Sequence, residues 1–339
     1  MFSDENKEEI ISILILRFPN IDIHSITNIN KIPFGSDAQI FIFDVILESS
    51  KRKFLLKLFR NRLPPERSEN EYLNLCKIYH SDIKVPQPFG FLKNTCSFKR
   101  PFMIMEFTEG DLLSKSLYNN FSNKNPLLNK FVENLISIHT CYWQTIFDNL
   151  NKPDIEHDPL IIIKSIINRT KPLVRVYNIL EFVPILEWLE NNMLEHHSCK
   201  ELVLCHGDYH PNNIIVNKKA ELITLDWSNV GLSDRRIDLA FTVVVINAEI
   251  HSKVDELIIS LYERLTHTTV GDLTYFKVLV HLFNFLRMYS AEKDYTITQE
   301  TEETKISFLH EYRNYCLEVL RIMKENIHSS FPTIEKFLK

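Results

Sequence analysis

Residues 206–216 read HGDYHPNNIIV, and a second apolar run, LITL at 222–225, follows after a polar turn and ends directly before Asp226. Two β-branched or apolar runs around a short polar turn predict a β-hairpin. We therefore expect Asp208 and Asn213 on a rigid loop before the first strand, and Asp226 at the end of the second. In a hairpin these two ends lie side by side, so oxygen atoms of Asn213 and Asp226 can meet at one metal cluster.

These three polar residues are the types that magnesium-dependent phosphoryl transfer requires. One carboxylate receives the proton of the attacking hydroxyl, while an amide and a second carboxylate hold the metal ions that bridge the phosphates. We predict Asp208 as the general base or hydroxyl-orienting residue, Asn213 as a ligand of one Mg²⁺ and Asp226 as a ligand bridging two. A turn or helix-capping role is the alternative for Asp208 alone, but the spacing of all three residues favours catalysis.

Together with LDWSNVGLSDRRIDLA at 225–240, the first stretch resembles the aminoglycoside phosphotransferase and choline kinase superfamily of small-molecule kinases. The superfamily's H-G-D-x-x-x-x-N loop is matched at 206–213, its metal-binding aspartate at Asp226 and its D-L-A run at 238–240. The resemblance implies an α+β, bilobal protein-kinase-like fold with a small antiparallel-sheet N-lobe and a larger, mostly helical C-lobe. It also implies ATP and Mg²⁺ as cofactors, and γ-phosphoryl transfer to a hydroxyl of a small-molecule acceptor.

Lys57 is a lone cation inside the apolar run 54–59. This run belongs to the stretch 53–59, which we predict as a strand after another at 40–47. A buried ammonium group needs an anionic partner, although an edge-strand lysine could instead point to solvent. In the superfamily the matching lysine contacts the α- and β-phosphates and is held by a helix glutamate. The helix opened by Pro65 offers Glu71 or Glu69. The resemblance favours Glu71, which lies at the superfamily's usual distance before the Val85-Pro86 break.

The remaining nucleotide contacts are implied by the resemblance. Gly35 and Ser36, in the turn 34–38, would form the phosphate loop, because small residues let backbone amides approach phosphates closely. An ordinary hairpin turn is the alternative there. Glu106 and Thr108 belong to an apolar strand that ends in a polar, glycine-containing segment, which looks like the hinge that reads adenine through backbone groups.

Four further residues or runs support this interpretation. His206 is expected to fix the loop through a buried hydrogen bond, Asp238 to anchor it, and Trp227 to belong to the core. The run 231–235 (GLSDR) is similar to a G-x-A-D-R run of aminoglycoside phosphotransferases that act on the 3′-hydroxyl.

The length of 339 residues exceeds what one average core needs, so we expect two domains. The first is a nucleotide-binding N-lobe over 1–107, and the second is a C-lobe over 108–339 with the catalytic loop and the acceptor site. Apolar spacing predicts a helix at 7–17 and another over 127–138 that ends in Ile138-His139. Beyond Asp238, it predicts helices at 238–250, 253–266, 272–290 and 302–324.

Bulk composition excludes several partner classes. The formal net charge of −5 shows no basic stripe for nucleic acid. The apolar runs 241–246 and 278–286 are too short or interrupted to span a bilayer, and the acidic, polar start is no signal peptide. Six cysteines without C-x-x-C spacing fit a reducing compartment, so we predict a cytoplasmic protein. Oligomeric state is not indicated.

Two alternative functions remain. A protein kinase would need D-F-G and A-P-E motifs, whereas this chain has Asp226-Trp227-Ser228 and no A-P-E. A catalytically silent nucleotide-binding or scaffold protein would fit the sparse phosphate loop, but it has no physical need for the full set of Lys57, Asp208, Asn213 and Asp226. An aminoglycoside-like antibiotic or another amine or sugar is the expected acceptor, and ATP is not distinguished from GTP.

Overall fold

The structure, a computed structural model, describes residues 2–32, 38–47, 50–60, 65–122, 125–146, 152–250, 252, 254–297, 313–327, 330–332 and 335. The chain divides into two units. Unit 1 comprises Met1–Leu113, Gln144–Phe147 and Asn212–Asn229, and unit 2 comprises Ser114–Trp143, Asp148–Pro211 and Val230–Lys339.

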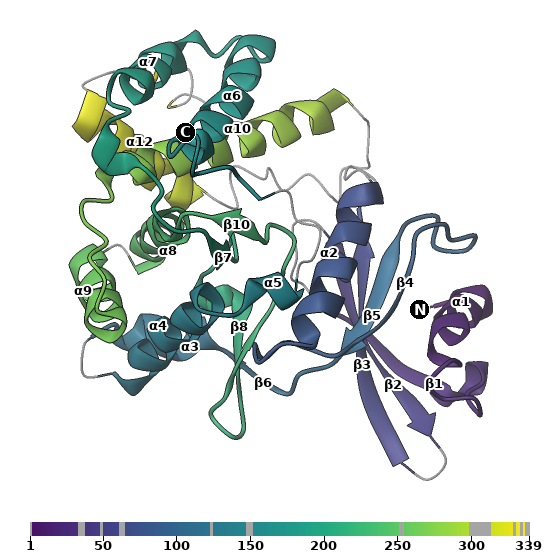
Figure 1. Ribbon diagram of the computed structural model, residues 1–339. Coiled ribbons are helices and arrows are strands. Elements are labelled where there is room, and N and C mark those ends of the chain that lie inside the picture. The colour runs from purple at the N-terminus through teal and green to yellow at the C-terminus, as the bar shows by residue number, and fades with distance from the viewer. Residues whose placement is uncertain are drawn as a thin grey trace. The chain divides into compact units, whose positions relative to one another are not determined.

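Unit 1 contains a five-stranded antiparallel sheet in the order β1-β2-β3-β5-β4 (Figure 1). Its strands are β1 (Ile26–Ile32), β2 (Ala38–Leu47), β3 (Ser50–Phe59), β4 (Pro88–Leu92) and β5 (Phe102–Glu106). The 3₁₀ turn η1 (Ile23–Ser25) precedes β1. The antiparallel sheet predicted for the N-terminal part of the chain is confirmed.

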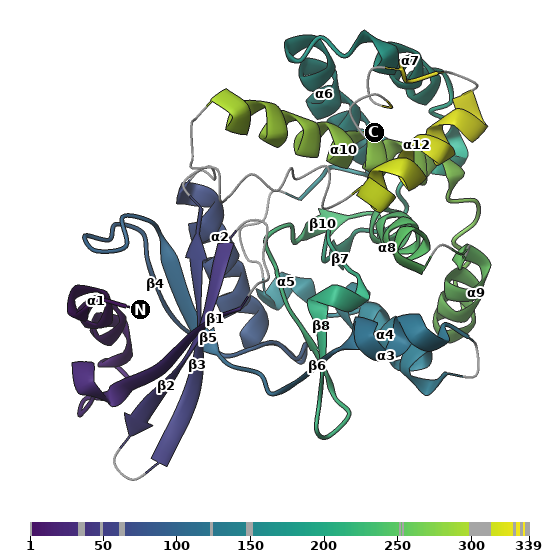
Figure 2. The same ribbon diagram turned by 180° about the vertical axis from the view of Figure 1, so that it is seen from behind.

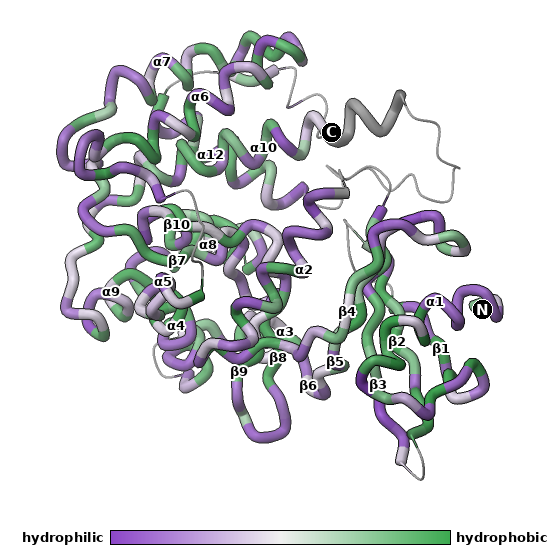
Figure 3. The backbone as a smooth tube through the Cα atoms, turned by 45° about the vertical axis from the view of Figure 1, so that its right-hand side comes forward, coloured by the Kyte–Doolittle hydropathy of each residue, from purple (hydrophilic) through white to green (hydrophobic). Residues whose placement is uncertain are grey.

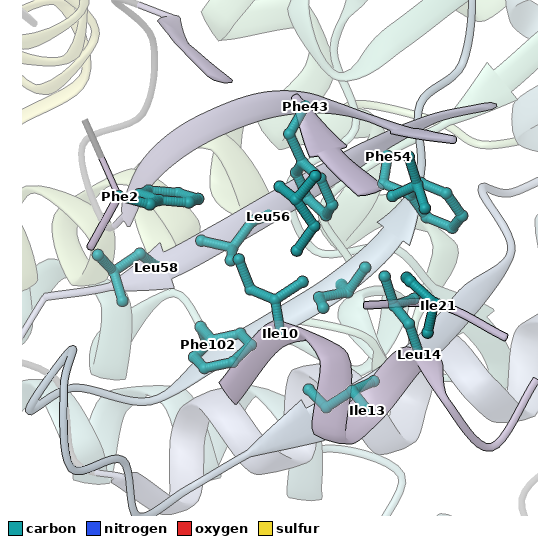
Figure 4. Packing of buried hydrophobic residues seen from close by; sticks show 13 residues of the cluster. Phe2, Ile10, Ile13, Leu14, Ile21, Phe43, Phe54, Leu56, Leu58 and Phe102 are labelled. Atoms are coloured by element: carbon teal, nitrogen blue, oxygen red, sulfur yellow. The ribbon is translucent and has the colours of Figure 1, made fainter. Parts of the chain in front are cut away.

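The two faces of this sheet carry different residues, because side chains alternate along each strand. Phe54, Leu56 and Leu58 of β3 are buried on the face covered by α1 (Asp4–Leu14), as Figure 4 shows. Lys57 therefore points to the opposite face, against which α2 (Pro65–Tyr79) lies (Figures 1 and 2). The alternation of side chains along β3 thus directs Lys57 toward α2.

A second, three-stranded sheet of unit 1 holds the predicted hairpin. Its order is β6-β8-β9, with β6 (Gly110–Leu112), β8 (Ile214–Asn217) and β9 (Leu222–Thr224). The hairpin's turn is hydrophilic (Figure 3). At the end of β9, the Thr224 amide donates to the Lys84 carbonyl oxygen at 2.9 Å, which attaches the hairpin to the segment between α2 and β4. An ion pair between Lys84 and Glu221 adds to this attachment. Pairing with β6 was not predicted.

Unit 2 is mainly helical, with one two-stranded ladder of β7 (Val203–Cys205) and β10 (Gly231–Ser233). Its principal helices are α4 (Pro126–His139), α6 (Ile161–Val176), α7 (Val183–Asn191), α8 (Arg235–Ile250), α9 (Asp255–Thr266), α10 (Thr274–Ile297) and α12 (Arg313–Ile327). Short segments are α3 (Leu113–Leu117), α5 (Trp143–Ile146), η2 (Tyr118–Asn120), η3 (Leu180–Phe182), η4 (Glu195–His197) and η5 (Pro211–Asn213).

The central helix of unit 2 is α8, which packs against α10, α12 and β7 (Figure 2). The helices predicted at 238–250, 253–266 and 272–290 are present, and α8 begins and α10 ends several residues beyond the predicted bounds. The predicted helix 302–324 is described from Arg313 onward. Among the described helices, none combines the length and apolarity needed to cross a membrane.

Candidate active site

The backbone of the predicted catalytic loop is held by one carboxylate, that of Asp238. Its oxygens accept hydrogen bonds from the amides of His206, at 2.6 Å, and Gly207, at 2.7 Å. The Nε2 atom of His139 lies 3.3 Å from the same carboxylate. Burial alone would raise the pKa of Asp238, but the hydrogen bonds that its carboxylate accepts from His139 and from the Gly207 amide lower it. The buried Asp238 is therefore an ionised anchor, the role that the sequence predicts.

The loop's own residues complete this framework around Asp208. Gly207 adopts a φ of 78°, which favours glycine. The Nδ1 atom of buried His206 accepts a hydrogen bond from the Asp208 amide at 3.2 Å, which is the kind of buried hydrogen bond predicted from the sequence. The buried Tyr209 hydroxyl donates to the Phe131 carbonyl oxygen at 2.6 Å. The Asp208 carboxylate, by contrast, is 28% exposed, so a rigid backbone presents a partly solvated acid.

Asn213 and Asp226 are brought together by the hairpin ladder. The Leu225 amide donates to the Asn213 carbonyl oxygen at 2.8 Å, immediately beyond the Ile214–Thr224 pair of β8 and β9. Asp226 follows with a φ of 56°, a left-handed conformation that costs a residue other than glycine on the order of 1 kcal/mol. An amide and a carboxylate at adjoining ends of one hairpin are hard oxygen donors of the kind that Mg²⁺ binds, so the residues present fit a magnesium site.

Lys57 lies between two carboxylates of unit 1. Its Nζ atom is 2.5 Å from Glu71 Oε1 and 3.4 Å from Asp226 Oδ2. The Lys57 and Glu71 side chains are almost fully buried, whereas the Asp226 side chain is 34% exposed. Glu69 instead accepts a hydrogen bond from Lys93 at 2.9 Å. Of the two predicted partners, Glu71 forms the ion pair, and it holds a cation at the edge of the Asp226 carboxylate.

The other predicted nucleotide contacts have different outcomes. Gly35 and Ser36 lie outside the described residues. Glu106 ends β5, where its amide donates to the Gln87 carbonyl oxygen at 2.8 Å. Thr108 lies in the three-residue link between β5 and β6. Both predicted hinge residues therefore belong to the same unit as Lys57.

The GLSDR run forms β10 and the start of α8, and its acid has a structural partner. Asp234 is buried and binds the Arg236 guanidinium group. That group also donates to the carbonyl oxygens of His197, at 2.9 Å, and Ser198, at 2.7 Å. Trp227 is buried, as predicted. The run therefore fixes α8 to the chain that precedes β7.

Sequence reasoning did not single out His139 or Tyr262 as functional residues. His139 was expected only as the end of a helix with apolar periodicity. It reaches Asp238, which is 99 positions later in the chain, and its Nδ1 atom lies 2.8 Å from the Tyr262 hydroxyl. A lone histidine at a helix end carries no local signal of either partner.

Comparisons with known proteins identify a family and a fold. Residues 40–270 match the model of the phosphotransferase enzyme family. No curated protein is significantly similar to the chain in sequence.

Three solved structures show the fold. A putative aminoglycoside phosphotransferase from Ralstonia eutropha JMP134 has a TM-score of 0.62 at 14% identity, covering 89% of this chain and 93% of that one. Spectinomycin phosphotransferase, solved with ADP and spectinomycin, has a TM-score of 0.55 at 15% identity and covers 93% of each chain. Choline kinase from Streptococcus pneumoniae has a TM-score of 0.55 at 16% identity, covering 87% and 94%.

The fold of these structures is the predicted α+β, protein-kinase-like fold. The family match spans more than half of the chain and includes Lys57, the catalytic loop and Asp226. The chain therefore belongs to the phosphotransferase enzyme family.

Proposed function

We propose that the protein transfers the γ-phosphoryl group of ATP to a hydroxyl group of a small molecule, with Mg²⁺ as cofactor. The observation that carries this proposal is Lys57, held by Glu71 beside Asp226. A buried ammonium group next to a partly exposed carboxylate, with Asn213 at the adjoining strand end, is an arrangement suited to a metal-bound polyphosphate. The spectinomycin phosphotransferase structure contains ADP, which supports an adenine nucleotide here.

Each polar residue has a distinct part in the proposed reaction. Lys57 binds the α- and β-phosphates, and Glu71 keeps its ammonium group in place. Asn213 and Asp226 offer the oxygen atoms that hold magnesium, which when bound neutralises the charge developing on the transferred group. Asp208 accepts a hydrogen bond from the acceptor hydroxyl, orients it in line with the γ-phosphorus and takes its proton.

The proposed acceptor is an aminoglycoside-like antibiotic or another amine or sugar metabolite. Solved structures with the same fold include phosphotransferases for spectinomycin and kinases for choline and ethanolamine. We further propose that 1–107 serves as the nucleotide lobe and that 108–339 supplies the catalytic loop and the acceptor site. In this scheme the hinge residues Glu106 and Thr108, with Gly35 and Ser36, complete the nucleotide site.

The test is magnesium-dependent ATP consumption against a panel of aminoglycosides, macrolides, amino alcohols and sugars. We expect turnover with one acceptor class, abolished by Asp208→Ala and unchanged by Glu187→Ala, which removes an exposed acid of α7.

Near-normal turnover by Asp208→Ala would show that Asp208 is not the catalytic acid–base residue. If the protein neither consumes ATP nor gains thermal stability from Mg-ATP, the proposed kinase activity is wrong, and a silent scaffold protein is the better interpretation.

A further inference from the structure

We propose that Tyr262 on α9 is a positioning residue for the catalytic loop. Together with Asp238 it fixes which ring nitrogen of His139 carries the proton. His139 then donates a hydrogen bond to the Asp238 carboxylate, which also holds the backbone of the loop. The inference concerns unit 2 alone, and it rests on the proposed function only where it assigns Asp208 to the transfer step.

Three buried side chains from three helices carry this inference. The Tyr262 hydroxyl lies 2.8 Å from His139 Nδ1, and His139 Nε2 lies 3.3 Å from Asp238 Oδ2. Tyr262 and Asp238 are fully buried, and His139 is 4% exposed. The imidazole and phenol rings are 5.7 Å apart and tilted by 65°, so they meet through the hydroxyl group rather than by stacking.

The direction of each hydrogen bond follows from Asp238. An ionised carboxylate can only accept, so the Nε2 atom of His139 must carry a hydrogen. In a neutral imidazole the Nδ1 atom is then an acceptor, and the Tyr262 hydroxyl supplies its donor. Burial is the main reason that the pKa of Tyr262 is raised to about 12, so its hydroxyl group keeps its proton. The hydroxyl therefore has a hydrogen to donate to Nδ1, which lies 2.8 Å away.

Without the tyrosine hydroxyl, the buried Nδ1 atom of His139 loses its hydrogen-bond donor, and only the Asp238 carboxylate still favours a hydrogen on Nε2. The other neutral form carries its hydrogen on Nδ1 and turns a bare Nε2 toward Asp238 Oδ2, which places two acceptors about as close as the present hydrogen bond. Asp238 then loses one of its three N–H donors. Because the same carboxylate holds the amides of His206 and Gly207, a weaker anchor loosens the backbone immediately before Asp208.

A metal site is the competing interpretation, because ligand atoms of His139, Cys205 and Asp238 all lie within 4.8 Å of one another. The contacts favour a hydrogen-bond network. Both ring nitrogens of His139 have partners, and the Cys205 thiol donates to the Asp234 carbonyl oxygen at 3.5 Å. Burial raises the pKa of Cys205 well above its usual value, so the thiolate that a metal needs is disfavoured.

Tyr275 provides a matched control. Its hydroxyl, also buried in unit 2, donates to the Leu189 carbonyl oxygen at 2.8 Å, and it has no part in the contacts of Asp238. Tyr275→Phe and Tyr262→Phe each remove one buried hydroxyl group, so a difference between them reports the link to the loop rather than a general loss of stability.

The first measurement needs no substrate. Amide hydrogen exchange at His206 and Gly207 should become about 10- to 100-fold faster in Tyr262→Phe, and stay unchanged in Tyr275→Phe, because a hydrogen bond to a charged network is weakened. The ¹⁵N spectrum of labelled histidine should show His139 protonated at Nε2 in the parent and altered in Tyr262→Phe. Equal exchange in the two variants, or an unchanged His139 spectrum, would overturn the proposal.

The second measurement uses the acceptor found in the panel above. Tyr262→Phe should lower kcat about 10- to 100-fold and leave KM for Mg-ATP unchanged, because a displaced reacting group slows the chemical step. In a His139→Gln background, which removes the Nδ1 acceptor, Tyr262→Phe should have no further effect, whereas additive losses would contradict a role through His139. The exchange result stands without turnover, so failure of the proposed function is separable from failure of this inference.

Discussion

The ammonium group of Lys57 is shared by two carboxylates that differ in burial. Glu71 is almost fully enclosed, while Asp226 is open enough to bind a further cation. Glu71 and Glu69 are two positions apart, and residues two apart do not share a helix face, so only one of them can reach the sheet. Both glutamates are candidates from the sequence alone. The face that α2 turns toward the sheet depends on tertiary packing, and it selects Glu71.

Removal of this cation should weaken nucleotide binding. We expect Lys57→Met to raise the dissociation constant of Mg-ATP about 10-fold or more, because a charge-assisted hydrogen bond contributes roughly 1.5–3 kcal/mol. Isothermal titration calorimetry measures the change. Glu69→Gln, on the same helix but paired with Lys93, is the control and should bind within a factor of about two of the parent. Equal loss in both variants would refute the assignment of Glu71.

Asp238 should give the protein a specific acid sensitivity. Its folded-state pKa is lowered, so its stabilisation is complete above the ordinary carboxyl pKa of about 4 and is lost as pH falls through the folded value. We expect Asp238→Asn to lower the free energy of unfolding by about 3 kcal/mol at neutral pH, since a donor replaces an acceptor facing buried N–H groups. Urea titrations from pH 7 to pH 3 should show the difference from the parent shrinking, and a pH-independent difference would contradict this account.

At the scale of elements, α1 illustrates how a helix is fixed before it is packed. Ser3 and Asn6 form a reciprocal capping box at its start. Ile10, Ile13 and Leu14 then face the sheet of unit 1 at helical spacing (Figure 4). Apolar periodicity predicts this helix over 7–17, slightly later than observed, because the first turn of the helix contains only polar residues and shows no apolar periodicity.

The buried face of α1 should dominate its contribution to stability. Leu14→Ala, at a fully buried position, is expected to cost about 2–5 kcal/mol in the free energy of unfolding. Leu16→Ala removes the same atoms from a side chain that is 91% exposed and should cost less than about 0.5 kcal/mol. Chemical denaturation of both variants tests the helix placement, and a large loss in Leu16→Ala would show that this helix is placed wrongly.

Elements with local signals were predicted, and those that depend on distant partners were not. The β8–β9 hairpin and α4 follow from apolar runs and turn residues that lie next to each other in the chain. Strands β6 and β10 are three residues long and show no alternation, so they exist only because β8 and β7 lie beside them. The contact between His139 and Asp238 could not be predicted either, because the two residues are 99 positions apart in the chain.

At the scale of the whole molecule, the groups proposed for the nucleotide and for the acceptor belong to different units. Unit 1 contains Lys57, Glu71, Asn213 and Asp226, and unit 2 contains Asp208. The catalytic loop passes from one unit to the other between Pro211 and Asn212. Composition and periodicity cannot predict this division, because the boundary between the two units falls inside one continuous motif.

This division predicts separable defects. Asp226→Ala should weaken Mg-ATP binding, about 10-fold or more, and abolish turnover, since it removes a proposed metal ligand. Asp208→Ala should abolish turnover and leave the Mg-ATP dissociation constant within a factor of about two of the parent. Calorimetry with Mg-ATP, in parallel with turnover assays, distinguishes the two. A strong binding defect in Asp208→Ala would argue against the separate roles.

At Asp226, the left-handed backbone conformation makes the residue that is best for stability different from the residue that is needed for activity. Glycine adopts this conformation without the steric cost that aspartate bears. A library selected only for heat resistance should therefore favour glycine at 226, and the survivors should be stable proteins that have lost their catalysis. A selection that also requires activity should keep aspartate at 226, because the reaction needs its carboxylate although the backbone conformation favours glycine.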